Sequence, residues 1–270
     1  MSAIEENALS LGTLFLLSNL FVVLLTGIPV LVSFPDIRPD SPGFYSGADI
    51  LRLLEPIVAL PLQMLIFTSS INFTGDSESH GKQPAGRVVL IIVFSFACAL
   101  YQQGAGFHSA ANMFKNSIAP IYESVDTTPE IVKIYDWMRN VWEHLISHYI
   151  YAAGGILISW VYAYQFRNYV IEGGIKRWST RIVWFLASLT YAAVISFVAI
   201  EFIKGSIVAL CLIVIYGYGC LGTFLYSRHD GFVLGKRIVI QYYLLAYTIA
   251  LVVVVGWMGK YGLKSRNEFK

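Results

Sequence analysis

Three histidines have a spacing that suits metal chemistry. His144 is followed four residues later by His148, and His108 is followed four residues later by Asn112. Residues four apart lie on one face of an α-helix, so His144 and His148 would present two imidazoles together. Two imidazoles from one helix and a third from another leave one position of a tetrahedral zinc ion open. We expect His108, His144 and His148 to bind zinc or a similar divalent metal.

The same four-residue spacing continues from the pair His144 and His148 toward the N-terminus. It passes from His144 through Asn140 to Asp136, which predicts one polar stripe along the helix. Asn112 and Asn140 are then expected to hydrogen-bond the metal ligands. A metal ion with an open position lowers the pKa of its bound water and produces a nucleophile at neutral pH. The stripe therefore indicates a site for hydrolysis.

Four acidic side chains are candidates for the general base or the fourth ligand: Glu55, Asp136, Glu143 and Glu201. Glu55 begins one apolar segment and Glu201 ends another, and both would reach the membrane face that His108 shares. Glu143 points about 100° away from its neighbour His144 on a helix, so it suits a base better than a ligand. The pattern leaves all four acids open for this role.

The elements that must position these residues are membrane-spanning helices. Of the 270 residues, 56% are hydrophobic and only 13% are charged, against roughly a quarter charged in soluble domains. Several apolar runs are long enough to cross a hydrocarbon core of about 30 Å as helices. Lipid offers no partner to the backbone, so each span must satisfy its own hydrogen bonds as a helix. The sequence predicts an all-α membrane protein, residues 1–270 forming a single bundle of seven transmembrane helices: Leu11 to Phe34, Ile50 to Phe73, Arg87 to His108, Val141 to Phe166, Arg181 to Phe202, Ser206 to Tyr226 and Ile238 to Gly259.

Local signals mark where two helices begin and turn. Thr128 can cap a helix that has Pro129 at its first position, and this helix would run into the fourth span. Its bend is expected at Gly154 and Gly155. The short connection 201–205 makes the fifth and sixth spans an antiparallel hairpin.

Seven spans are an odd number of crossings, so the two termini are expected on opposite sides of the membrane. Short connections around 167–181 and 228–237 are strongly basic and lie on the N-terminal face. Basic residues collect in short cytoplasmic connections, which favours a multi-pass protein with a cytoplasmic N-terminus.

Other polar residues suggest structural roles. Asn19 and Gln241 lie within spans and favour hydrogen bonds between helices, while His80 and His229 fall in polar connections. The three cysteines (Cys98, Cys211 and Cys220) are expected to be small apolar core residues. The basic residues behind the net charge of +2 form no continuous stripe, so nucleic acid is not an expected partner. The expected partner is membrane lipid.

The Phe107-His108 dipeptide and the pair His144 and His148 resemble the membrane hydrolase superfamily of alkaline ceramidases and adiponectin-type receptors. That superfamily also has seven spans, with an early FH dipeptide and an HxxxH pair. The resemblance implies zinc and hydrolysis of an amide. In the superfamily the pair lies in the last span, whereas here it lies in the fourth, and the seventh contains no histidine.

Three functions remain open at this stage. The first is a metal-dependent hydrolase that acts on a lipid or another amphiphile through His108, His144 and His148. The second is a non-enzymatic transporter or receptor that binds a small ligand or metal at the same polar cluster. The third is a haem protein, with His108 and either His144 or His148 as axial ligands. A set of interfacial hydrogen bonds without a ligand is the structural alternative.

Overall fold

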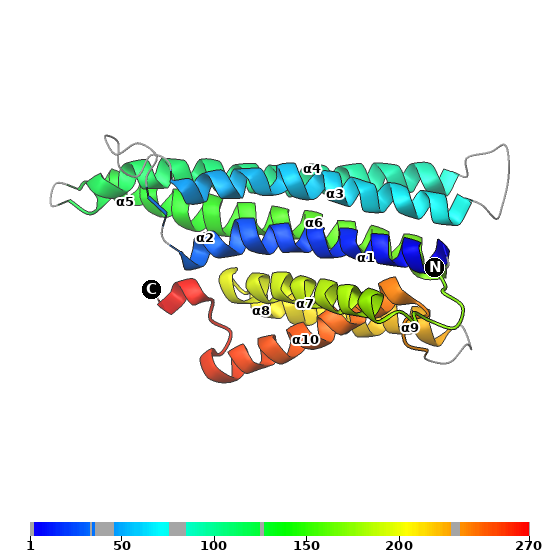
Figure 1. The fold of residues 1–270 in the computed structure, drawn as a ribbon. Coiled ribbons are helices and arrows are strands. Elements are labelled where there is room, and N and C mark those ends of the chain that lie inside the picture. Colours follow the sequence, from blue (N-terminus) through cyan, green and yellow to red (C-terminus); the bar gives the residue numbers. More distant parts are fainter. Residues whose placement is uncertain are drawn as a thin grey trace.

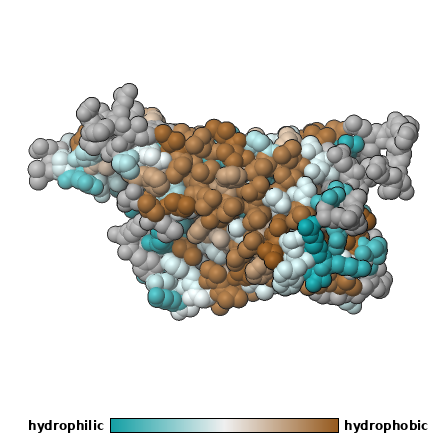
Figure 2. Space-filling view, viewed as in Figure 1, coloured by the Kyte–Doolittle hydropathy of each residue, from teal (hydrophilic) through white to brown (hydrophobic). Residues whose placement is uncertain are grey.

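The computed structural model describes residues 3–32, 34–35, 46–75, 85–124, 127–227 and 233–269. Every element in these residues is helical, and seven helices are long and apolar enough to cross a membrane. The predicted fold class and the number of spans are therefore confirmed, and the chain is a multi-pass membrane protein. In Figure 2 hydrophobic side chains form a belt across the middle of the visible face, with hydrophilic ones toward both ends.

The first four spans include two that are built in pieces. The first consists of α1, a π-helical segment and α2; the second and third are α3 and α4; the fourth consists of α5, a π-helix, α6 and a 3-10 turn. Their bounds are α1 Ala3–Val22, π Val23–Gly27, α2 Ile28–Leu31, α3 Gly47–Gly75, α4 Ala85–Tyr122, α5 Pro129–Asp136, π Trp137–Ser147, α6 His148–Gln165 and 3-10 Phe166–Asn168.

The last three spans form the other half of the bundle. The fifth is α7, the sixth consists of α8, a π-helix and α9, and the seventh is α10, followed by a 3-10 turn. Their bounds are α7 Trp178–Glu201, α8 Gly205–Cys211, π Leu212–Leu221, α9 Gly222–Tyr226, α10 Ile238–Tyr261 and 3-10 Arg266–Phe269.

The helices run alongside one another in three groups (Figure 1). Helices α3 and α4 lie on one side, α7, α8 and α10 on the other, and α1 and α6 between them. The core forms where α1 meets its neighbours. Phe15 of α1 is 2% exposed, and its ring centroid lies 4.9 Å from that of Tyr242 and 5.4 Å from that of Trp184. The Trp184 indole N–H donates to the Ala8 carbonyl at 3.0 Å, which ties α7 to α1.

The two ends of the chain lie at opposite ends of the bundle (Figure 1). We therefore expect Ala3→Cys and Glu268→Cys to react with a membrane-impermeant thiol reagent from opposite sides of sealed vesicles. The measurement uses a background in which the native cysteines are replaced, so that only the introduced thiol reacts. Labelling of both positions from the same side would show that the chain crosses the membrane an even number of times.

The fourth span begins as predicted, but the third is longer than predicted. Thr128 Oγ1 accepts the N–H of Ile131 at 3.4 Å, and Pro129 is the first residue of α5. Helix α4 continues to Tyr122, well past the predicted end at His108. The predicted end at His108 rested on the length of the apolar run alone. The helix continues beyond it because its last turn packs on α5. The Tyr122 and Tyr135 rings stack there, 4.1 Å apart.

The bend expected at Gly154 and Gly155 is wrong, because α6 continues as an α-helix through both residues. Gly154 instead allows α6 to pass close to α4. A Cβ at this position would lie 2.5 Å from the backbone nitrogen of Tyr101, which no real side chain tolerates. Small residues let membrane helices approach in this way. The irregular segment of this span is the π-helix that precedes α6.

Two cysteines also differ from the prediction. Cys211 and Cys220 are exposed on the outer surface of the bundle instead of lying in its core, and Cys98 is half-buried.

Asn19 does join two helices, since its amide donates to the Tyr242 hydroxyl at 2.9 Å. Gln241 instead holds the connection before its own helix, through the Gly235 N–H and the Val233 carbonyl. His80 and His229 lie outside the described residues.

Candidate functional site

The three histidines line one pocket at the end of the bundle where the C-terminus lies. We call it the histidine pocket; its volume is about 370 Å³. Most of the spans contribute to its wall, together with the C-terminal turn. Its lining residues are Val22, Thr26, Gly27, Pro29, Arg52, His108, Lys115, Arg139, Glu143, His144, His148, Tyr151, Val194, Phe197, Val198, Glu201, Phe202 and Arg266.

The imidazole rings form a stack in the wall. His108 of α4 and His148 of α6 lie nearly parallel, with ring centroids 5.0 Å apart and planes 13° apart. On its other face His148 stacks on Phe202, at 4.4 Å and 21°. The His144 ring meets His148 edge-on, at 5.5 Å and 61°. The structure thus brings together the three histidines that the sequence singled out.

The π-helix Trp137–Ser147 decides which of its side chains reach the pocket. A π-helix closes its hydrogen bonds after five residues and so winds more loosely than an α-helix, which changes the side chains that share a face with the residues after it. The side chains five apart are Arg139 with His144 and Glu143 with His148, and all four line the pocket. The Nδ1–H of His144 donates to the Arg139 carbonyl, 2.5 Å away and five residues back.

The predicted stripe is therefore wrong in its first half. Asp136 and Asn140 are exposed and do not line the histidine pocket. Arg139 and Glu143 take the places that an α-helical repeat would give to those two residues. The prediction assumed α-helical spacing throughout and therefore missed the π-helix.

Glu143 forms the main ion pair of the pocket with Lys115 of α4. The Lys115 ammonium donates to both carboxylate oxygens, at 2.8 and 2.9 Å, and the Glu143 side chain is 8% exposed. The same carboxylate lies 3.7 Å from His144 Nδ1. Lys115 follows His108 by seven residues, two turns along the same face of α4. That spacing was the signal in the sequence that could have added Lys115 to the site.

The C-terminal segment returns to the pocket after the last span. Helix α10 ends at Tyr261, and the next residue, Gly262, has a φ of 69°, a left-handed conformation that glycine adopts without steric cost. The chain then folds back, and Arg266 Nε lies 2.9 Å from Glu201 Oε1 at the end of α7. Glu201 therefore lines the pocket as predicted, with an arginine that sequence spacing could not place there.

Asn112 does not support a histidine, contrary to the prediction. Its amide donates to Asp49, which is fully buried in the first turn of α3. The other Asp49 oxygen accepts the Ser46 N–H and hydroxyl, each at 2.9 Å, and Ser46 Oγ accepts the Asp49 N–H in return. This reciprocal cap begins α3. Arg52, one turn later, lies 3.7 Å from Asp49 and reaches the histidine pocket.

Glu55, the remaining candidate base, is separated from the imidazoles. Its carboxylate is 1% exposed and accepts the Tyr101 hydroxyl at 2.5 Å. The Tyr101 hydroxyl lies 2.5 Å from that of Tyr151, and Tyr151 lines the histidine pocket. The carboxylate therefore touches the pocket only through two tyrosines.

The arrangement of the residues does not fit a zinc ion. The nitrogen lone pairs of an imidazole lie in the ring plane, so the stacked rings of His108 and His148 cannot direct theirs to one point. Among the described residues, no three His, Cys, Asp or Glu side chains are grouped so that they could hold a metal. Four cationic side chains in the same wall would also repel a divalent cation. Zinc binding stays a prediction from the sequence.

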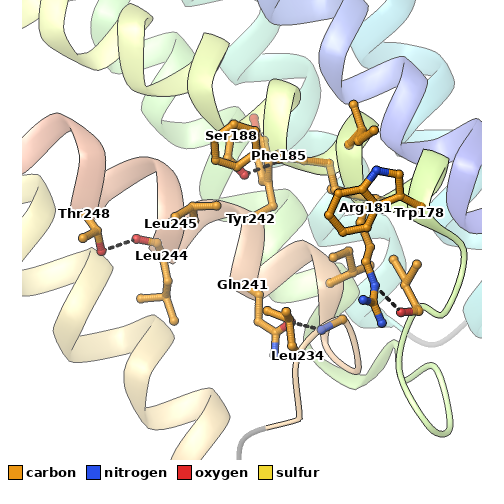
Figure 3. A pocket seen from close by; sticks show the side chains of 15 residues that line it. Trp178, Arg181, Phe185, Ser188, Leu234, Gln241, Tyr242, Leu244, Leu245 and Thr248 are labelled. Carbon is orange, nitrogen blue, oxygen red and sulfur yellow. Dashed lines mark hydrogen bonds between the residues drawn. The ribbon is translucent and has the colours of Figure 1, made fainter.

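A second, larger cavity lies between α7 and α10, near the other end of the bundle (Figure 3). Its volume is about 640 Å³, and its wall is mainly aliphatic and aromatic, with Arg181 as the one charged side chain among the described residues that line it. Arg181 Nε donates to the Ile175 carbonyl at 2.8 Å. Gln241 at the edge is already bonded to the preceding connection. The cavity offers volume and apolar surface but no cluster of reactive groups.

The fold and the site define a helical multi-pass membrane protein with a cationic, histidine-lined pocket at one end of its bundle. No family model, no curated protein and no solved structure matches the chain. The resemblance to alkaline ceramidases and adiponectin-type receptors therefore stays a prediction from three histidines.

Proposed function

We propose that this protein is a membrane transporter or receptor that binds an amphiphilic organic anion in the histidine pocket. The observation that carries this proposal is the charge of the wall. Among the described residues of the wall, four carry a permanent positive charge and two are carboxylates, an excess of 4 − 2 = 2 positive charges: Arg52, Lys115, Arg139 and Arg266 against Glu143 and Glu201.

The ion pairs in the wall leave arginine available to a ligand. Glu143 is held by Lys115 and Glu201 by Arg266, so neither carboxylate neutralises the remaining arginines. Within the described residues, the ion pair of Arg52 is a long contact to Asp49, at 3.7 Å. In the part of the chain that the structure describes, the guanidinium of Arg139 forms no ion pair. An arginine guanidinium binds carboxylate, phosphate or sulfonate oxygens through two parallel hydrogen bonds.

The rest of the wall suits an apolar group. Val194, Phe197 and Val198 of α7 line the pocket beside Phe202 and the stacked imidazoles. The volume of about 370 Å³ is within the range of roughly 300–1,000 Å³ that small-molecule sites occupy. A ligand with an anionic head and a short hydrocarbon chain would satisfy both parts of the wall. This supports a lipid-like anion over a fully hydrophilic one.

Calorimetric titration of the purified protein with amphiphiles of equal chain length tests the proposal. Decanesulfonate and decyl phosphate are expected to bind, whereas decyltrimethylammonium is not. Arg139→Gln should weaken anion binding about tenfold or more, because a hydrogen bond to a charged group contributes roughly 1.5–3 kcal/mol. Lys133→Gln is the matched control, since it removes an exposed cation of α5 that does not line the pocket. Equal binding of anion and cation, or equal effects of the two substitutions, would contradict the proposal.

The same samples distinguish the metal-dependent hydrolase. Removal of metal with a chelator is expected to leave the affinity for decanesulfonate unchanged. Stoichiometric zinc that is lost in His108→Ala or His148→Ala, together with zinc-dependent cleavage of an amide or ester amphiphile, would favour the hydrolase instead.

A further inference from the structure

Glu55 is a buried carboxylate inside the membrane-spanning part of α3. It lies eight residues after Gly47, about 12 Å along the helix, and is 1% exposed. Among the described residues no Lys or Arg forms an ion pair with it, and its hydrogen-bond partners are the neutral hydroxyls of Tyr101 and Tyr151. Ionisable residues within membrane spans are costly to insert and usually have a functional role.

The two tyrosines that follow Glu55 are held in place by the crossing of α4 and α6. Gly104 comes three residues after Tyr101, and Gly154 comes three residues after Tyr151. A Cβ on Gly104 would lie 2.4 Å from the Tyr151 nitrogen, and one on Gly154 would lie 2.5 Å from the Tyr101 nitrogen. This reciprocal close approach brings the two ring centroids to 4.2 Å, with the ring planes tilted by 34°, and the two hydroxyls to 2.5 Å.

The resulting chain connects a buried carboxylate to the anion site. It runs from Glu55 through the Tyr101 hydroxyl to the Tyr151 hydroxyl, and Tyr151 lines the histidine pocket. Each tyrosine hydroxyl can donate one hydrogen bond and accept another, so the chain can reverse its direction when a proton passes.

We infer that Glu55 takes up a proton when an anion binds in the histidine pocket, which makes the proposed binding protein proton-coupled. This inference rests on the proposed function. A second negative charge near a buried carboxylate is repelled strongly, because the surroundings of low dielectric screen it little. Protonation of Glu55 removes that repulsion, and by linkage each of the two ligands strengthens binding of the other.

The proton transfer balances along the chain. A hydronium ion that enters the pocket from solution gives a proton to the Tyr151 oxygen and leaves as water, Tyr151 gives its own proton to the Tyr101 oxygen, and Tyr101 gives its own to Glu55. Both tyrosines end neutral, and Glu55 ends as a carboxylic acid. The proton returns to the pocket by the reverse steps when the anion leaves.

Few other ionisable groups lie near the hydrogen-bonded path from Glu55 through Tyr101 to Tyr151, and experiment can distinguish their protonation from that of Glu55. Helix α3 itself carries Asp49 and Arg52, and α4 carries His108 and Lys115 besides Tyr101. Helix α6 contributes His148 besides Tyr151. The first span approaches with the uncharged Thr26, since its two acids, Glu5 and Glu6, lie at the other end of the bundle. The imidazoles are therefore the competing proton acceptors.

Proton uptake on binding of decanesulfonate tests the inference, because a sulfonate head does not itself titrate. In weakly buffered detergent with a pH indicator, the wild-type protein should take up about one proton per anion bound. Glu55→Gln should bind the anion without proton uptake, whereas Glu130→Gln, an exposed acid of α5, should behave as wild type. Tyr151→Phe should slow proton uptake by about 10²-fold. Tyr162→Phe is the control and should leave the rate unchanged, because the Tyr162 hydroxyl donates to the Gln63 carbonyl and is not part of the hydrogen-bonded path from Glu55 to the pocket.

The outcomes separate this inference from the proposed function. Failure of the wild-type protein to bind the sulfonate would overturn the proposed function. Anion binding without proton uptake would overturn the inference but not the proposed function. Uptake that persists in Glu55→Gln would do the same, because it would assign the proton to an imidazole. If Glu55→Gln does not fold, Tyr151→Phe still decides, since uptake by Glu55 passes through the Tyr151 hydroxyl whereas uptake by an imidazole in the pocket wall does not, so an unchanged rate of uptake would overturn the inference.

Discussion

Lys115→Met is expected to lower the free energy of unfolding by about 3–5 kcal/mol, which is the usual cost of removing one partner of a buried ion pair. The Lys115 ammonium contacts both oxygens of Glu143, whose side chain is 8% exposed. Methionine fills much of the same volume but leaves the carboxylate without its cation. The measurement is equilibrium unfolding in mixed micelles.

A second substitution shows whether the stranded charge is the cause. Lys115→Met combined with Glu143→Gln removes both charges, so we expect most of the lost stability to return. Glu172→Gln is the control, because Glu172 is 85% exposed and its contact with Lys236 is 3.9 Å long. An exposed pair of this kind contributes about 0–1 kcal/mol. If the double variant is no more stable than Lys115→Met, the ion pair does not explain the loss.

Gly154→Val is expected to destabilise the bundle by about 1–3 kcal/mol or more, as overpacking does elsewhere. The Cβ would lie 2.5 Å from the Tyr101 nitrogen and 2.8 Å from the Ala97 carbonyl oxygen. Both are backbone atoms, so no side chain can move aside, and α4 must separate from α6. Thermal unfolding in detergent measures the loss.

Gly106→Val is the matched control, since a Cβ at Gly106 of α4 meets no atom within 4 Å. We expect it to unfold at the wild-type temperature. Because separation of the helices also parts the Tyr101 and Tyr151 hydroxyls, Gly154→Val should lose proton uptake at temperatures where it is still folded. A Gly154→Val protein with the stability of Gly106→Val would show that the two helices do not depend on this close contact.

The sequence by itself determined the membrane architecture. Lipid cannot hydrogen-bond the backbone, so each long apolar run had to become a helix, and counting the runs was enough to predict seven spans. The start of α5 was also local, because Thr128 and Pro129 need only their own neighbours to begin a helix. The histidines were found for a similar reason, since polar side chains are conspicuous at the ends of apolar segments.

The composition of the site was only partly predictable. Sequence spacing found His108, His144, His148, Glu143 and Glu201, all of which line the histidine pocket. It also selected Asp136 and Asn140, which are exposed, because the prediction extended α-helical winding through residues that form a π-helix. The arginines that give the pocket its charge were missed, since each comes from a different part of the chain.

Only the tertiary structure decided what the pocket can bind. The angle of 13° between the His108 and His148 rings depends on how α4 and α6 cross, and it separates a stack from a metal site. Arg266 reaches Glu201 because the chain turns back at Gly262, a contact between segments far apart in sequence. Glu55 is linked to the pocket through tyrosines of two other helices. Periodicity places a residue on a face of its own helix, whereas these contacts depend on which faces of different helices meet, and packing alone sets that.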